Sequence, residues 1–134
     1  MTASKIVAAA ASSVGGSGLD IDEVFRTFLY TGTGSQQTIV NDIDLSGEGG
    51  LVWTKSRSNT STDHHLNDTE RGADKALITN SDAGQATSGT YSLNQFNSNG
   101  FRLDGGGNVN ASGQTYCSWT FRKAPHFFDV VTWT

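Results

Sequence analysis

The sequence has little cysteine, proline and charge. It contains one Cys and one Pro, and 16% of its 134 residues are charged, against roughly 25% in an average globular chain. One Cys excludes a disulfide framework and a Cys-based zinc module. No uncharged apolar run approaches the roughly 20 residues of a membrane span, so we expect no membrane insertion. The net charge of −4 leaves no basic stripe to neutralise phosphates, and we expect no nucleic-acid partner.

Small and turn-forming residues dominate instead. Gly, Ser, Thr and Asn supply 56 of the 134 residues, and aromatic residues make up 10%. A disordered chain would have fewer aromatics and more charge. The composition therefore favours short strands joined by turns, in a chain sized for one domain.

Residues 1–24 differ from the rest of the chain. Good helix formers occur only at 4–11, and the apolar run from Ile6 is too short for the core of a signal peptide. Residues 12–18 hold three Gly and three Ser, which is typical of a flexible linker. We predict a short extended or helical N-terminal arm that attaches the domain to a larger particle, with Ile6, Val7 and Val14 as candidate anchor residues.

From Phe25 onward, apolar residues alternate with polar ones, and turn signals interrupt them every eight to twelve residues. This spacing predicts an antiparallel all-β sandwich or barrel over residues 25–124. Asn99-Gly100 is the strongest hairpin signal. The longest predicted strand, residues 115–123, places Cys117, Trp119 and Phe121 on one face, which we expect to pack in the core. Tyr116 has polar neighbours on its own face, so we expect Tyr116, like Tyr91, to lie at the surface as a candidate ligand contact.

Residues 125–134 begin with the hinge residue Pro125, and this segment has two interpretations. Residues 128–134 share an aromatic start and an aromatic-Thr end with residues 25–31. The segment is thus either the closing strand of the sandwich or the first strand of a following repeat.

The densest group of candidate metal ligands surrounds His64 and His65, but adjacent strand residues point to opposite faces, so we expect no transition-metal site. We expect Asp68 and Arg71 to hydrogen-bond a turn in which Gly72 takes a conformation that other residues avoid. In the Gly-rich loop at 104–110, Asp104 and Asn108 are candidate surface or ligand contacts.

That loop supplies only one carboxylate, so we expect no calcium ion and no other cofactor. No nucleophile is paired with a base, and a buried, inert Cys117 is expected. We therefore expect no catalytic residues and no enzyme activity. The spacing of carboxylates alone leaves a polysaccharide-degrading enzyme open as the alternative of another class.

Four motifs, taken in order, resemble a lectin-like module of tailed-bacteriophage virion structural and tail-fibre proteins, as in marine and cyanobacterial phages. They are Gly50-Leu51-Val52-Trp53-Thr54-Lys55-Ser56-Arg57-Ser58, His64-x-Leu66-x-Asp68-Thr69-x-Arg71-Gly72-Ala73-x-Lys75, Phe96-Asn97-Ser98-Asn99-Gly100-Phe101 and Thr115-Tyr116-x-x-Trp119-Thr120-Phe121-Arg122-Lys123-Ala124. Asn67 departs from the pattern, which has a large apolar or aromatic residue there.

The resemblance implies a concanavalin A-like (LamG-type) jelly roll in a phage virion, in the tail rather than the head. It implies a structural, adhesin-type protein whose partners are other virion proteins of the tail, portal, adaptor or capsid, with a host surface glycan as ligand. It further implies a homo-oligomer, with a trimer favoured. A capsid decoration or head-fibre protein of the same fold is the alternative within this class.

Overall fold

The protein is described by a computed structural model that covers residues 18–87 and 93–134. It is a sandwich of two antiparallel sheets, which confirms the predicted all-β sandwich. The first sheet, sheet A, has the strand order β1 (Phe25–Thr31), β9 (Thr115–Arg122), β3 (Gly50–Ser56), β4 (His65–Asp68), β5 (Lys75–Ile78) and β6 (Ala86–Thr87). Sheet B has the order β2 (Gln37–Val40), β8 (Gly100–Leu103) and β7 (Leu93–Asn97).

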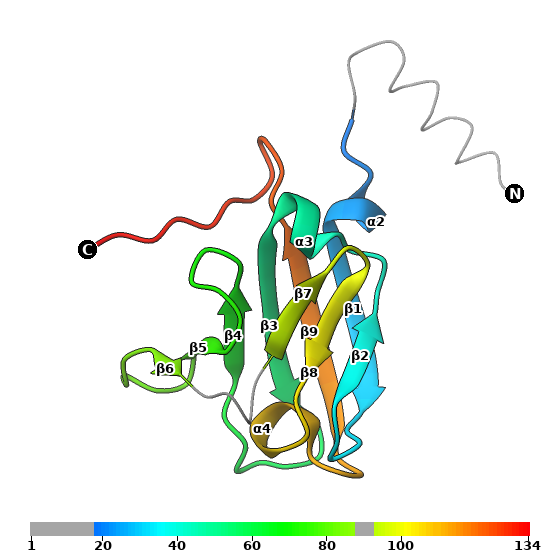
Figure 1. The fold of residues 1–134 in the computed structure, drawn as a ribbon, viewed down its shortest axis with the longest axis vertical. Helices are drawn as coiled ribbons and strands as arrows, with labels where there is room; N and C mark the ends of the chain where they lie inside the picture. Colours follow the sequence, from blue (N-terminus) through cyan, green and yellow to red (C-terminus); the bar gives the residue numbers. More distant parts are fainter. Residues whose placement is uncertain (1–17, 88–92) are drawn as a thin grey trace, which may run out of the picture.

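Strands from the two halves of the chain pair with each other. β1 pairs with β9 and β2 pairs with β8, so each sheet joins residues far apart in the sequence. In the described part of the chain, three short helices lie at the ends of the sandwich (Figure 1). α2 (Ile21–Val24) and α3 (Leu45–Glu48) are at one end, and α4 (Gly107–Asn110) is at the other. None of the helices in the described part of the chain has the length and apolar character that crossing a bilayer requires.

The core lies between the two sheets. Tyr30 of β1 and Tyr116 of β9 stack with ring centroids 5.2 Å apart, and Val52, Phe101 and Leu103 are fully buried with them. Each tyrosine hydroxyl has a hydrogen-bond partner. The Tyr30 hydroxyl donates to the Val109 carbonyl at 2.8 Å, and the Tyr116 hydroxyl accepts from the Ala111 amide at 2.9 Å. Burial raises the pKa of both phenols, that of Tyr30 most strongly.

The predicted orientation of β9 is wrong. Tyr116, Ser118 and Thr120 are fully buried and face the core, whereas Trp119 and Phe121 are partly exposed on the opposite face of sheet A. Tyr116 is therefore not a surface residue. The small hydroxyl residues of this face fit beneath sheet B. Thr120 accepts a hydrogen bond from Asn41 at 2.9 Å, whereas the buried Ser118 hydroxyl has no hydrogen-bond partner in the described structure.

Other boundaries agree closely with the sequence pattern. β1 begins at Phe25, and the predicted hairpin joins β7 to β8, with Ser98-Asn99 as the turn and Gly100 as the first residue of β8. β2 ends at Val40, and α3 begins at Leu45. Asn67, the departure from the motif, is buried, and its amide donates to the Lys75 carbonyl at 3.0 Å.

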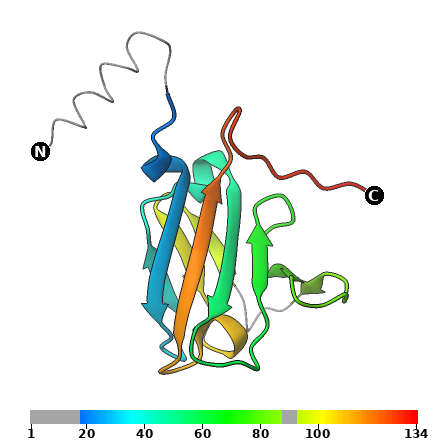
Figure 2. The same ribbon diagram turned by 180° about the vertical axis from the view of Figure 1, so that it is seen from behind.

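The C-terminal segment forms no closing strand in the described structure. It contributes one isolated bridge, between Ala124 and Phe128. Beyond that bridge the chain runs away from the sandwich (Figures 1 and 2), and Val131 and Trp133 are 68% and 87% exposed. Of the predicted arm, residues 1–17, including Ile6, Val7 and Val14, lie outside the described residues.

Candidate functional site

A short helix, α3, forms one wall of the main surface cleft. The carboxylate of Asp44 accepts a hydrogen bond from the Gly47 amide at 2.8 Å and caps the helix. Gly49 ends the helix with a positive φ of 82°, a conformation that glycine adopts without strain. The Gly-rich stretch at 45–49 is thus a capped turn of helix, and it holds Glu48 at the edge of the cleft.

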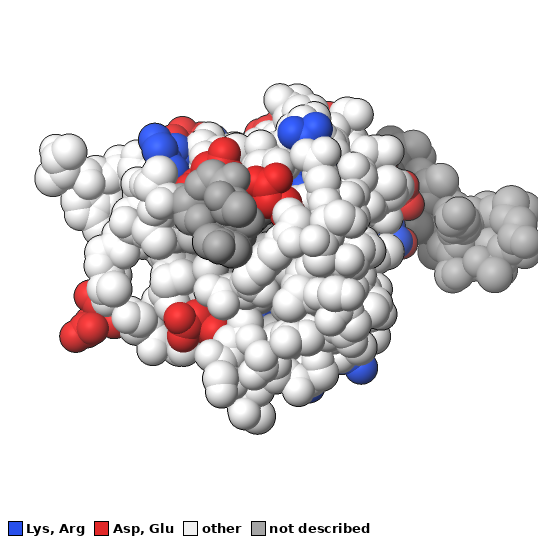
Figure 3. Space-filling view, turned by 60° about the horizontal axis from the view of Figure 1, so that its bottom comes forward, with Lys and Arg blue, Asp and Glu red and all other residues white. Residues whose placement is uncertain are grey.

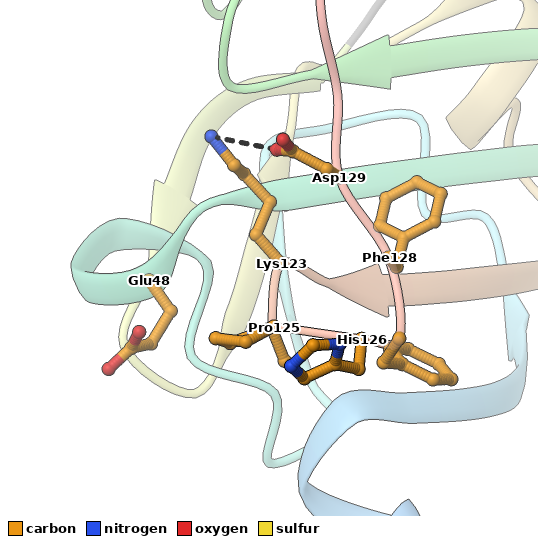
Figure 4. Close-up of a pocket in the computed structure, with 8 residues that line it drawn as sticks. Glu48, Lys123, Pro125, His126, Phe128 and Asp129 are labelled. Carbon is orange, nitrogen blue, oxygen red and sulfur yellow. Dashed lines mark ion pairs between the residues drawn. The ribbon is translucent and has the colours of Figure 1, made fainter.

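The cleft has a volume of about 630 Å³ and lies between α3 and the turn that follows β9 (Figure 4). Its lining combines charged side chains with aromatic and imidazole rings, and consists of Glu48, Lys123, Ala124, Pro125, His126, Phe127, Phe128 and Asp129.

A second hollow of about 450 Å³ shares Glu48 and Lys123 with the first. It extends toward sheet B, where Asn94, Gln95 and Phe96 of β7 line it. Because two side chains belong to both hollows, we treat them as one depression, the Lys123 groove.

Lys123 is the charged centre of this groove. Its Nζ lies 2.7 Å from Glu70 Oε1 and 3.3 Å from Asp129 Oδ1, and Figure 4 shows it directed toward Asp129. The hydrogen bonds to Glu70 and Asp129 raise the pKa of Lys123 above its ordinary value. The ammonium thus links the turn after β4 to the C-terminal segment.

The groove offers the chemical groups that bind a polyhydroxylated ligand. The Glu48 carboxylate can accept hydrogen bonds from hydroxyl groups, and the Gln95 amide can both donate and accept them. Phe127 is 38% exposed and Phe128 is partly exposed. Their aromatic rings offer apolar faces. Such a combination of apolar surface with a few directed polar groups is typical of small-ligand sites.

The structure separates the candidate ligand contacts predicted from the sequence. Tyr116 is in the core, and Tyr91 lies outside the described residues. The carboxylate of Asp104 accepts a hydrogen bond from Asn94 at 2.6 Å, and Asn108 lies partly buried in α4. Figure 3 shows the α4 end of the molecule, where acidic and basic side chains are scattered over a largely uncharged surface.

The predicted turn at Asp68, Arg71 and Gly72 is formed. The Asp68 carboxylate accepts from the Arg71 amide at 2.8 Å and also pairs with its guanidinium. The Gly72 amide donates to the Asp68 carbonyl at 3.1 Å, with φ at +96°. This turn leads directly from β4 past Glu70, so its structural role includes presenting Glu70 to Lys123.

His65 is the first residue of β4 and is buried, whereas His64 precedes the strand and is partly exposed. Within residues 18–87 and 93–134, no group of three or more His, Cys, Asp or Glu side chains is arranged to hold a metal ion. Cys117 is 8% exposed on the outer face of β9, and burial raises the pKa of its thiol.

Sequence reasoning missed the charged residues of the Lys123 groove. Glu70 and Lys123 are 53 residues apart, and no spacing rule connects them. The only local signals were the basic pair Arg122-Lys123 and the following Pro125. The groove depends on two turns from separate strands meeting at one end of the sandwich.

A comparison with protein-family models matches residues 20–127 to the family described as "Domain of unknown function (DUF7483)". No curated protein matches the chain, and no solved structure matches it.

Proposed function

The chain belongs to the DUF7483 family, a domain of unknown function, and we propose that it is a non-catalytic binding module of a phage virion. In this proposal the sandwich is a concanavalin A-like jelly roll of the tail-fibre or adhesin type, attached through residues 1–24 to other virion proteins. It displays the Lys123 groove to glycans of the host surface. The four sequence motifs are the basis for the virion assignment.

The pairing of strands supports the jelly-roll proposal. In a jelly roll, strands from the two chain ends pair with each other and alternate between the sheets. Here β1 pairs with β9 in sheet A, and β2 pairs with β8 in sheet B.

The observation that carries the glycan proposal is the composition of the Lys123 groove. Its amides, its free-standing carboxylate Glu48 and its exposed ring Phe127 suit hydroxyl groups and the apolar faces of a sugar ring. Single contacts of this kind bind weakly, and many copies on one particle raise the avidity.

The test uses an array of bacterial surface polysaccharides and the full chain. We expect Glu48→Gln and Phe127→Ala each to weaken binding about tenfold, the loss of one hydrogen bond or one stacking contact. Glu23→Gln changes an exposed carboxylate outside the groove and serves as the matched control. Binding that is equal in all four proteins contradicts the proposed site.

The same array distinguishes binding from cleavage. The alternative, a polysaccharide-degrading enzyme, needs two carboxylates free to act as acid and base or nucleophile. Glu70 and Asp129 are both paired with Lys123, which favours binding. Turnover of a polysaccharide that disappears on changing one groove carboxylate would overturn the non-catalytic proposal.

The virion assignment has its own test. Deletion of residues 1–20 is expected to abolish incorporation into particles while the sandwich stays folded, as judged by circular dichroism. Retained incorporation contradicts the attachment role of the arm. Immunogold labelling of intact particles separates a tail location from the head-fibre or capsid-decoration alternative.

A further inference from the structure

The outer face of sheet A, the one turned away from sheet B, is mostly apolar. Val52, Thr54 and Ser56 of β3 are buried toward the core, so the alternate residues of this strand point outward. The register extends the same assignment to the neighbouring strands. The outward positions are occupied by the apolar residues Phe25, Leu29, Cys117, Trp119, Phe121, Leu51, Trp53, Leu66 and Leu77 and by the polar residues Thr27, Thr31, Thr115, Lys55, Asp68 and Lys75. The face is thus mostly apolar over β1, β9 and β3, and it carries charged residues at β4 and β5.

Aromatic contacts run across this outer face. Trp53 and Trp119, directly opposite each other in the register, have ring centroids 5.2 Å apart. Phe25 and Phe121 are 4.8 Å apart. Leu29 at one side is 56% exposed. Phe128 packs against Phe121 at one end of the face, and in Figure 2 no helix or strand of the described structure covers the rest. A solvated sheet face normally carries polar residues, and an exposed apolar patch of this kind marks an interface.

The extent of the face suits a protein partner. Three strands of seven or eight residues and two of four residues cover about 450 Å² in projection, at spacings of about 4.8 Å between strands and about 3.3 Å per residue. Side-chain relief raises the accessible area toward the roughly 600–1,000 Å² per partner of a standard interface.

We propose that this outer face is a docking surface for a second copy of the chain, in a back-to-back dimer with two-fold symmetry. The symmetry axis lies in the interface, parallel to the strands, and passes between Trp53 and Trp119. In such an isologous contact every pair of residues occurs twice. Trp53 of each copy therefore lies against Trp119 of the other.

Charge supports a second copy as the partner. Among the outward positions of β1, β9 and β3, Lys55 is the only charged residue. A two-fold axis along the strands places Lys55 against Cys117 of the other copy and not against the second Lys55. The outer face of sheet B offers no equally apolar alternative, because there Val40 is accompanied by the polar Thr38 and Arg102.

This dimer does not depend on the proposed virion or glycan function. An isologous face pairs two copies and does not build the trimer that the family resemblance implies. The groove around Lys123 lies at the end of the sandwich (Figure 4), so it stays accessible in the dimer.

Sedimentation velocity of the full chain between about 1 and about 100 μM tests the proposal. We expect a concentration-dependent monomer–dimer equilibrium. Thr27→Arg adds charge at an exposed position beside Trp119 and is expected to weaken the dimer at least tenfold. Val40→Arg adds the same charge at an exposed apolar position on sheet B and is expected to leave it unchanged.

A charge-reversal pair tests the two-fold arrangement. Across the axis, Thr27 of one copy faces Leu66 of the other, whereas within one chain β9 and β3 separate the two residues. Thr27→Arg and Leu66→Glu are each expected to weaken association, and the double variant is expected to recover at least tenfold over either one. Circular dichroism confirms folding of each variant.

Several outcomes overturn the inference. A wild-type chain that is monomeric at all concentrations refutes the docking surface, as does association that Val40→Arg disrupts and Thr27→Arg leaves intact. A trimer refutes the two-fold symmetry. Failure of the folded double variant to recover refutes the assigned axis.

Discussion

Two buried polar residues illustrate how individual side chains determine stability in this sandwich. Asn110 is fully buried and uses both ends of its amide. Its Oδ1 accepts from the Thr33 amide at 3.0 Å and from Gln37 Nε2 at 2.6 Å, and its Nδ2 donates to the carbonyls of Ser35 and Asp104. It thereby ties the β1–β2 loop to the loop before α4, and these partners satisfy an amide that would otherwise be buried unpaired.

His65 is the contrasting case. Its side chain is 5% exposed, and neither ring nitrogen has a hydrogen-bond partner in the described structure. Burial lowers its pKa; the nearby carboxylate of Asp63 opposes this shift and His64 adds to it. The imidazole is therefore held neutral next to Thr54 and Ile78 of the adjacent strands.

The sign of the pH dependence follows from this shift. The unfolded chain protonates His65 near its ordinary pKa of about 6.5, whereas the folded chain does so only at lower pH. Stability from the neutral imidazole is thus fully present above about pH 6.5 and decreases as the pH falls toward the folded-state pKa, by at most about 1.4 kcal/mol per pH unit.

We expect His65→Phe to remove this part of the pH dependence, because it fills the site without a titrating group. Urea unfolding of both proteins from pH 8 to pH 5 measures it: the difference in free energy of unfolding should grow in favour of the variant below about pH 6.5. His64→Phe, at the partly exposed neighbouring position, is the control. Parallel pH profiles for wild type and His65→Phe contradict the assignment.

At the scale of elements, the β7–β8 hairpin and its contact with β2 define sheet B. Gly100 follows the turn with φ at +150°, and an added Cβ would overlap the Ile39 carbonyl oxygen of β2. Glycine is needed here because the two backbones approach closely and because its φ is positive.

Gly100→Ala is expected to destabilise the fold by about 2 kcal/mol or more, since both the strained φ and the displaced β2 contribute. Gly84→Ala is the matched control, because a Cβ there meets nothing within 4 Å. Chemical denaturation of the two variants measures the difference. Equal stability would show that β2 adjusts freely, contrary to a tightly packed sheet B.

At the scale of the whole molecule, the residues that contribute to folding stability extend to about Asp129. Phe128 packs on Phe121 with centroids 5.2 Å apart, and Asp129 pairs with Lys123. Of the residues beyond them, Val131 and Trp133 are largely exposed and contribute little to folding.

Removing residues 130–134 is therefore expected to change the free energy of unfolding by less than about 0.5 kcal/mol. Removing residues 124–134 also deletes Phe128 and is expected to cost about 1–3 kcal/mol. Urea unfolding at one low protein concentration measures both, because self-association would add a concentration-dependent stabilisation. A larger loss in the shorter truncation would show that the terminal residues pack against the domain.

The sequence by itself determined the local features of this protein. Alternation and turn residues located the strands and predicted the all-β sandwich, because strand period and turn geometry are local properties. The Asp68–Arg71 turn and the hairpin at Asn99-Gly100 could be predicted for the same reason: their residues are neighbours in the chain. The resemblance supplied the function that is proposed for the groove.

Only the tertiary structure decided which face of each strand is buried and which distant side chains meet. Alternation in β9 defines two faces, but the position of sheet B decides that Tyr116 points inward and Trp119 outward. The Lys123 groove likewise required the turns that carry Glu70 and Asp129 to meet at one end. These choices depend on contacts between residues far apart in sequence, and no local pattern encodes them.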